Sequence, residues 1–433
     1  MTPAPAPAMT ETAFGVCLVL ILLVPWAGAG IALVNAGLGR SRSAAHAMLS
    51  SMCVMAVAAL VYFAIGFAWQ GYAGQPAHAF DIQGKAWSWI SSRGFLLSGV
   101  EFGLSPVSLT VLLGMFGAGL ASIIPLGSGA DRWRLGAACA STVILAGWTY
   151  PVFAHWIWAG GWLAQLGQNY GLGRGFLDTG GAGTIQAAGG LTALAITWLL
   201  GPRRGKYGSG GMPTALPGHH AVFVLLGCFL AWLGWLGLNG SGAILFYGAE
   251  LGRIALVAVN TTLAAMSAAL TAAAITRARF GKTDASLCAN GWVAGLAASS
   301  AACAFIRPAA AVLIGIVGGA LVVYSVEWLE LHLRVDDPGG AISVHGLGGI
   351  WGLLAVALFA QIPAQGQWLA QLAGIATLLG FILPLSYGLN WLLNRFYRLR
   401  VAPEGERQGL DLYELGAGAY PDFMTHNEDL WQR

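Results

Sequence analysis

Long apolar segments recur along this 433-residue chain and restrict the folds that it can adopt. Hydrophobic residues make up 57% of the sequence and charged residues only 9%, far below the roughly 25% of a soluble domain. Each apolar run is about as long as the stretch of helix that crosses a bilayer. Because lipid offers no hydrogen bonds to the backbone, these runs predict membrane-spanning helices. We therefore expect an all-α polytopic membrane protein.

The apolar runs predict eleven transmembrane helices. They cover residues 13–37, 44–69, 104–127, 133–154, 180–201, 219–242, 253–276, 285–303, 308–331, 343–361 and 367–394. An odd number of crossings places the two termini on opposite sides. With the N-terminus outside, 16 of the 21 Lys and Arg residues fall in inner segments, as the positive-inside rule requires. The net charge of +3 thus reflects topology, and we expect no nucleic-acid binding.

The same pattern divides the chain into three parts. Residues 1–12 form a short extracytoplasmic segment with no Lys or Arg, which is unlike a secretory signal with a basic start. Residues 13–400 form the membrane domain, and residues 401–433 form a cytoplasmic C-terminal tail. We expect this multi-pass protein in the cytoplasmic membrane.

Two stretches, 159 residues apart, are versions of one another. Residues 178–191 align without gaps on residues 337–350, with the Asp, the Ala and both Gly pairs identical. Asp178 lies at the outer end of the fifth predicted helix and Asp337 at the inner end of the tenth. The first five and the next five helices are therefore predicted to form an inverted repeat around a midplane site, with the eleventh helix extra. Each Asp can cap the start of its helix.

Gln186 and His345 occupy the same position in the two copies. Each follows its Asp by eight residues, which corresponds to roughly 12 Å of helix in a hydrocarbon core about 30 Å thick. A histidine at this depth predicts a functional site, because imidazole can exchange a proton near neutral pH. The alternative is a structural hydrogen bond between two buried helices.

An aromatic cluster precedes the first copy, in residues 148–162. Most such rings belong to an interfacial belt at the membrane surface. One ring facing a vestibule could instead hold a small cation over its face, and Trp158 is our candidate for that role.

The chain offers no pattern of metal ligands or of a nucleophile beside a base. Its six cysteines lie mostly within apolar runs without ligand spacing, so we interpret them as packing residues. We expect no metal, no cofactor and no enzymatic activity.

Several motifs occur in the order typical of one known family. They are Tyr150-Pro151 with His155-Trp156-Ile157-Trp158, residues 178–190, Trp235 to Ser241, Val259-Asn260-Thr261, residues 334–346, and the tail motif Gly409 to Tyr420. Across nearly the whole chain, this pattern resembles the ammonium transporter (Amt/Mep/Rh) family. The resemblance implies a homotrimer in which each eleven-helix protomer has its own narrow hydrophobic pore. It also implies that the cytoplasmic face docks a PII-type signal protein.

The resemblance also implies roles for individual residues. Trp158 corresponds to the tryptophan that recruits ammonium at an outer aromatic vestibule, and Asp178 to the structural acidic residue below it. Gln186 stands where the family has its first pore histidine. His345 matches the second pore histidine, and Trp235 matches a tryptophan that lines the pore region.

The chain departs from the family pattern at the outer gate. Leu238 stands where a phenylalanine is expected, and the vestibule serine falls at or beside Gly242, with Ser241 one residue early. Phe116 is the nearest candidate for the other gate aromatic. Together with Gln186, these departures put conduction in question.

The sequence thus supports three hypotheses. The first is a channel-like permease for ammonium, ammonia and methylammonium that uses His345, Gln186 and Trp158. The second is an ammonium sensor of the same family with little transport. The third is a permease for another small amine, in which Leu238 and Gly242 enlarge the vestibule.

Overall fold

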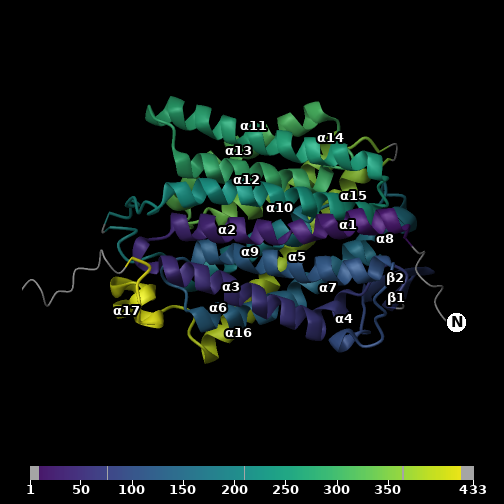
Figure 1. Ribbon diagram of the computed structural model, residues 1–433, viewed down its shortest axis with the longest axis horizontal. Helices are drawn as coiled ribbons and strands as arrows, with labels where there is room; N and C mark the ends of the chain where they lie inside the picture. Colours follow the sequence, from purple (N-terminus) through teal and green to yellow (C-terminus); the bar gives the residue numbers. More distant parts are fainter. Residues whose placement is uncertain (1–8, 76, 209, 363–364, 421–433) are drawn as a thin grey trace, which may run out of the picture.

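The protein is built from long helices that run side by side along one axis (Figure 1). This computed structural model describes residues 9–75, 77–208, 210–362 and 365–420. Small residues allow the helices to approach closely, as membrane packing requires. Gly30, for example, lies so close to α10 (Ala221–Tyr247) that a Cβ there would come within 2.4 Å of Gly227 O and Ala231 N.

The helices fall into two sequential sets. The first set is α1 (Glu11–Leu23), α2 (Pro25–Leu38), α3 (Ala44–Val61), α4 (Phe67–Gln70), α5 (Pro106–Gly129), α6 (Leu135–Ile144), α7 (Tyr150–Trp158), α8 (Trp162–Tyr170) and α9 (Ala188–Leu200). The second is α10 (Ala221–Tyr247), α11 (Ile254–Phe280), α12 (Ala285–Ala302), α13 (Pro308–His332), α14 (Gly348–Phe359), α15 (Gln367–Thr377), α16 (Leu383–Phe396) and α17 (Pro403–Gln408).

Short helical segments of other geometry extend several of these helices. The π-helical ones are η2 (Tyr62–Gly66), η4 (Leu145–Thr149), η5 (Ala182–Ala187), η7 (Ile342–Leu347), η8 (Leu378–Ile382) and η9 (Asp411–Leu415). Those of 3₁₀ geometry are η1 (Ser41–Ser43), η3 (Phe95–Leu97) and η6 (Leu251–Arg253). Isolated π-turns inside helices are rare and frequently mark functional sites, and η5 and η7 lie in the two copies of the repeat.

Ten helical stretches of the described chain are long and apolar enough to cross a membrane, which confirms the polytopic all-α prediction. They agree with ten of the eleven predicted spans. The eighth predicted span is present as α12, which packs among α11, α13 and α14 but is less apolar. The count of eleven crossings therefore stays a prediction that depends on α12.

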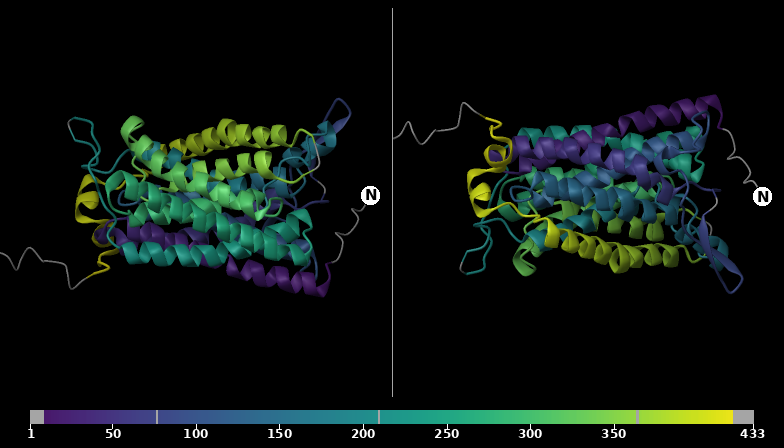
Figure 2. Two further views of the ribbon diagram at one scale, coloured as in Figure 1. Left: turned by 90° about the horizontal axis from the view of Figure 1, so that it is seen from above. Right: turned by 90° about the horizontal axis from the view of Figure 1, so that it is seen from below.

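The prediction missed a β-hairpin. Strands β1 (His78–Ile82) and β2 (Lys85–Ile90) pair antiparallel. Gln83 and Gly84 join them, both with positive φ, as a tight hairpin turn requires. The hairpin lies at the end of the bundle where the described chain begins, which we call the N-terminal face. The opposite end, which carries α17, is the C-terminal face (Figures 1 and 2).

The two copies of the repeat enter the bundle from opposite faces, as predicted. The backbone oxygen of Asp178 accepts a hydrogen bond from Trp158 at the end of α7, and α7 contacts the hairpin strand β2. Asp337 instead accepts from Ser128 near the end of α5. Its neighbour Asp336 lies beside Arg132. The backbone oxygen of Arg132 accepts a hydrogen bond from Val401 N in the C-terminal segment.

The domain boundaries at residues 12 and 400 stay predictions, because residues 1–8 and 421–433 lie outside the described residues. Residues 401–420 are described and contain α17 and η9. Asp411 fixes this segment to the bundle, because its carboxylate accepts hydrogen bonds from the backbone N–H groups of Ala45 and His46. The predicted tail thus begins as a structured segment.

Candidate functional site

Each repeat begins with an aspartate that accepts hydrogen bonds from the first turn of a π-helical segment. Oδ2 of Asp178 accepts from Gly183 N, Thr184 N and Thr184 Oγ1 at 2.8–3.0 Å. Both carboxylate oxygens of Asp337 accept hydrogen bonds, which come from Ser128 Oγ and from the N–H groups of Ala341 and Ile342. In contrast, Oδ1 of Asp178 has no hydrogen-bond partner among the described residues. These contacts satisfy N–H groups that a helix start leaves free.

The two copies cross each other through glycines. A Cβ at Gly190 would lie 2.1 Å from Gly346 N, and a Cβ at Gly349 would lie 2.9 Å from Ala187 N. Gly190 and Gly349 are equivalent in the repeat, as are Ala187 and Gly346. The crossing is therefore pseudo-symmetric, and only small residues permit it.

Gln186 and His345 meet at this crossing. His345 Nδ1 lies 2.8 Å from Gln186 Oε1. An amide oxygen can only accept a hydrogen bond, so His345 carries its proton on Nδ1, and Nε2 presents a lone pair. Gln186 is fully buried, and its Nε2 has no hydrogen-bond partner in the described part of the chain. The pair therefore offers one free acceptor and one free donor group.

Trp235 covers the imidazole. Its ring stacks beside that of His345 with centroids 6.5 Å apart and an interplanar angle of 29°. Its indole N–H donates to Ser300 Oγ at 3.0 Å, which fixes the ring. Leu238, less than one turn further along α10, is buried. The surroundings of the pair on this side are thus largely apolar.

Trp158 lies at the N-terminal face of the same repeat. Its indole N–H donates to Asp178 O at 2.8 Å. One face of its ring stacks on Phe246, with centroids 4.4 Å apart and planes 6° from parallel. The neighbouring Tyr247 hydroxyl accepts a hydrogen bond from Asp178 N. Sequence reasoning missed Phe246 and Tyr247, because only the folded α10 brings them to Trp158.

Packing constrains Ser241 and Gly242, the two positions that we predicted to lie at an outer gate. Ser241 is buried, and its hydroxyl donates back to Gly237 O at 2.7 Å. At Gly242 a Cβ would come within 2.1 Å of Thr179 O. A serine does not fit there, and the space is filled by backbone, so Gly242 does not enlarge a vestibule.

Phe116 lies in the middle of α5, half-buried against the apolar core. Its neighbour Gly117 faces Tyr150, whose hydroxyl would lie 2.5 Å from a Cβ at that position. Within the described residues, neither a hydrogen bond nor ring stacking joins Phe116 to Trp158. Its role at a gate stays a prediction.

The β-hairpin supports the aromatic cluster on α7. His155 donates from Nδ1 to Gln70 O at 2.6 Å and accepts at Nε2 from the Ser88 hydroxyl. Trp156 donates from its indole nitrogen to Trp89 O at 2.7 Å. These hydrogen bonds account for His155 and Trp156 as structural residues of the cluster, without a role in transport.

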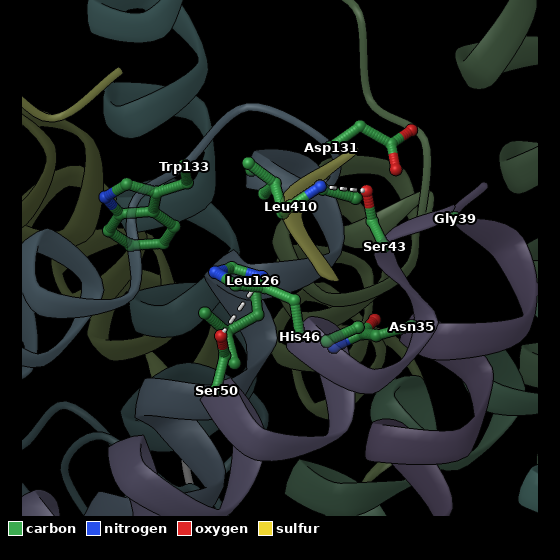
Figure 3. A pocket seen from close by; sticks show the side chains of 12 residues that line it. Asn35, Gly39, Ser43, His46, Ser50, Leu126, Asp131, Trp133 and Leu410 are labelled. Atoms are coloured by element: carbon green, nitrogen blue, oxygen red, sulfur yellow. Dashed lines mark hydrogen bonds between the residues drawn. The ribbon is translucent and has the colours of Figure 1, made fainter. Parts of the chain in front are cut away.

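The pocket in Figure 3 has neither Gln186 nor His345 in its lining. It is formed at the C-terminal face, where His46, Ser50, Asp131, Trp133 and Leu410 line it. Its volume of about 20 Å³ accommodates little more than a water molecule. No group of His, Cys, Asp and Glu residues in the described chain could hold a metal ion.

Charged residues from three loops are buried together at the C-terminal face. Arg203 donates to both carboxylate oxygens of Asp336 at 2.9 and 3.0 Å, and to Asp131 at 3.1 Å. Arg132 is fully buried and donates to Asp336 O. Burial alone would raise the pKa of Asp336, but hydrogen bonds and charge from Arg203 and Arg132 lower it to about 2. This cluster ties the loop before η7 to the rest of the bundle.

The inverted repeat, with its polar pair at the crossing, defines a membrane transport protein of the kind whose site lies between two halves. A model described as "Ammonium Transporter Family" matches residues 15–420. The chain therefore belongs to the ammonium transporter family, a class of membrane transporters rather than enzymes.

Individual relatives agree with this assignment. The chain is 36% identical to the ammonium transporter Amt2 of Archaeoglobus fulgidus, over 90% of this chain and 84% of that protein. It is 30% identical to an ammonium transporter of Bacillus subtilis, over 89% of this chain and 92% of the relative. A solved structure described as "Sensor Amt Protein" superposes with a TM-score of 0.83 at 28% identity, covering 93% of this chain and 98% of the other.

Proposed function

We propose that this protein is a channel-like permease that moves ammonia and ammonium, and also methylammonium, across the cytoplasmic membrane. The observation that carries the proposal is the hydrogen bond between His345 and Gln186 at the crossing of the repeats. It leaves a lone pair on His345 Nε2 and free N–H groups on Gln186. A neutral amine has a matching N–H group and lone pair, so it can bind both side chains at once.

The outer residues suit recruitment of a cation. The ring of Trp158 is held by Asp178 O and by Phe246 on one face. Trp158 is 7% exposed, and an ammonium ion that reached the face of its ring would gain about 0.5–2 kcal/mol depending on desolvation. Leaving water for an apolar path favours the neutral form, so ammonium would pass its proton to the lone pair on His345 Nε2, beside Trp235, and continue as ammonia.

The remaining parts of the proposal follow from family membership. The functional unit would be a homotrimer with one pore in each protomer, and the N-terminal face would lie outside the cell. The C-terminal face, which is rich in arginine, would be cytoplasmic and would dock a PII-type signal protein.

The direct test is current in proteoliposomes after an ammonium pulse, compared between wild type, Gln186→His and His345→Ala. We expect His345→Ala to lower the flux, because it removes the proton-accepting nitrogen. Gln186→His should tolerate or raise the flux, since a second imidazole restores a protonatable group. Absence of ammonium-dependent flux in all three proteins would eliminate the permease.

A second candidate function is an ammonium sensor with little transport. Two observations favour it: the likeness to the structure described as "Sensor Amt Protein", and the hydrogen bonds that attach Asp411 to α3. A sensor would change the accessibility of residues 401–420 when ammonium binds, without any flux. Limited proteolysis with and without ammonium, on the proteoliposomes used for the current measurement, separates the two functions.

A further inference from the structure

Four arginines line one cavity at the C-terminal face. Its volume is about 590 Å³, within the usual range for pockets that bind small ligands. It lies where the ends of α6, α9 and α16 meet the start of the C-terminal segment. Its lining includes Arg134, Arg204, Arg398 and Arg400, together with Tyr413 and Glu414.

The arginines outnumber the carboxylates around them. Glu406 pairs with Arg400 at 2.8 Å and with Arg204 at 3.7 Å, and Glu414 pairs with Arg134 at 3.7 Å. No ion pair within the described residues involves Arg398. Four guanidinium groups therefore face two carboxylates, which leaves an excess of two positive charges. Guanidinium groups in this arrangement suit a phosphate, which they can bind through two parallel hydrogen bonds.

The cavity adjoins the surface that faces lipid. On α16, Trp391 is 44% exposed and Phe396 is 85% exposed. Trp198 on α9 is 49% exposed, close to Leu199 of the cavity lining. Exposed aromatic residues of this kind mark the boundary between hydrocarbon and headgroups. An anion in the cavity would thus lie at the depth of lipid phosphates, with apolar surface beside it for acyl chains.

We propose that this cavity is a binding site for the phosphate of an anionic phospholipid headgroup. Arg398 and Arg204 would supply the contacts, because their side chains are the more exposed ones. Arg400 is already engaged with Leu200 O and Pro202 O and would mainly shape the wall. Because residues 400–403, Tyr413 and Glu414 form part of the lining, a bound headgroup would also hold the C-terminal segment against the bundle. Lipid binding at this cavity does not require that the protein conducts ammonium.

The test is lipid binding to the full chain in detergent, followed by native mass spectrometry. The probes are phosphatidylglycerol, phosphatidylcholine and inorganic phosphate. Arg398→Gln and the double variant Arg204→Gln/Arg398→Gln alter the site. Arg395→Gln is the matched control, because Arg395 lies on the same helix end but its guanidinium packs over Trp391 outside the cavity.

We expect phosphatidylglycerol to bind wild type and Arg395→Gln more tightly than phosphatidylcholine does. Each lost charge-assisted hydrogen bond weakens binding about tenfold or more, so Arg398→Gln should bind phosphatidylglycerol about tenfold and the double variant about a hundredfold more weakly. Circular dichroism of each variant confirms that the helices remain folded. Equal weakening by Arg395→Gln would show a general surface effect and overturn the site, as would an unchanged affinity in the double variant. Site-dependent binding of inorganic phosphate without binding of phosphatidylglycerol would overturn the lipid assignment.

Discussion

His345 donates a 2.8 Å hydrogen bond from Nδ1 to Oε1 of Gln186, its counterpart in the inverted repeat. The bond joins two side chains that are 159 residues apart and enter from opposite faces. It fixes the imidazole in one tautomer, because the amide oxygen cannot donate. Because the amide cannot take up a proton that His345 Nε2 accepts, we expect Gln186 to contribute to the pore by orienting the imidazole.

The first prediction concerns this orienting role. Gln186→Leu keeps similar volume but removes the acceptor, which leaves the buried Nδ1–H of His345 without a partner. We expect about a tenfold or larger loss of methylammonium uptake, since an unsatisfied buried donor costs about 1–3 kcal/mol. Radiolabelled uptake into proteoliposomes measures it. Gln186→His is the control, because a second imidazole can still accept the hydrogen bond. Unchanged uptake in Gln186→Leu would refute the orienting role.

The position of the polar pair could be predicted because the two copies share their spacing. The Asp and Gly residues that make the copies recognisable are those that cap the helices and permit the crossing, at Gly190 and Gly349 for example. Their proximity followed from the opposite directions of entry, whereas their depth in the membrane, inferred from the rise of a helix, stays a prediction. The bundle was predictable from hydrophobic runs, which report membrane burial directly.

Other features depend on contacts that one sequence does not reveal. The stacking of Phe246 on Trp158 joins the ends of two helices with no shared pattern. The charged cluster of Arg203, Asp336 and Asp131 assembles from three separate loops. The sequence around Gln83-Gly84 alternates between apolar and polar residues, as expected of a β-hairpin. The hairpin was still missed, because its strands are short and lie between much longer helical segments.

The second prediction tests the glycine crossing. Gly190→Ala would place a methyl group 2.1 Å from Gly346 N. The atoms that it meets belong to the backbone of the other repeat, so a shift that relieves the clash costs free energy. We expect a lower melting temperature in detergent and a loss of stability of about 1–3 kcal/mol, as for overpacking elsewhere. Gly388→Ala on α16 is the control, since a Cβ there meets nothing within 4 Å and alanine favours the helix. Equal melting temperatures for the two variants would contradict a close crossing.

The third prediction uses the difference between the two aspartates. In Asp178→Asn the amide oxygen can still accept the three hydrogen bonds that Oδ2 accepts in the wild type. The amide nitrogen then takes the place of Oδ1, which has no hydrogen-bond partner among the described residues. At Asp337 both oxygens accept hydrogen bonds, so an amide nitrogen would meet a donor. We expect Asp337→Asn to lower thermal stability more than Asp178→Asn, by about 1–3 kcal/mol. The reverse order would show that the buried charge, rather than the number of acceptors, decides stability.

The fourth prediction concerns pH and the charged cluster at the C-terminal face. The pKa of Asp336 is lowered from its ordinary value of 3.8 to about 2. A lowered pKa means that this carboxylate stabilises the folded protein above about pH 4, and that its contribution is lost as the pH falls toward 2. Asp336→Asn should therefore reduce stability at pH 7 by about 3–5 kcal/mol, because Arg203 and Arg132 lose a buried partner.

Thermal unfolding in detergent between pH 7 and pH 2 measures this effect. The difference in melting temperature between wild type and Asp336→Asn should shrink below pH 4, because the wild-type carboxylate becomes protonated there. Asp284→Asn is the control, since Asp284 caps α12 through Leu287 N at the surface and asparagine caps equally well. Its melting curve should stay close to wild type at every pH. A difference between Asp336→Asn and wild type that stays constant down to pH 2 would mean that Asp336 does not titrate in this range, and that the cluster does not depend on its charge.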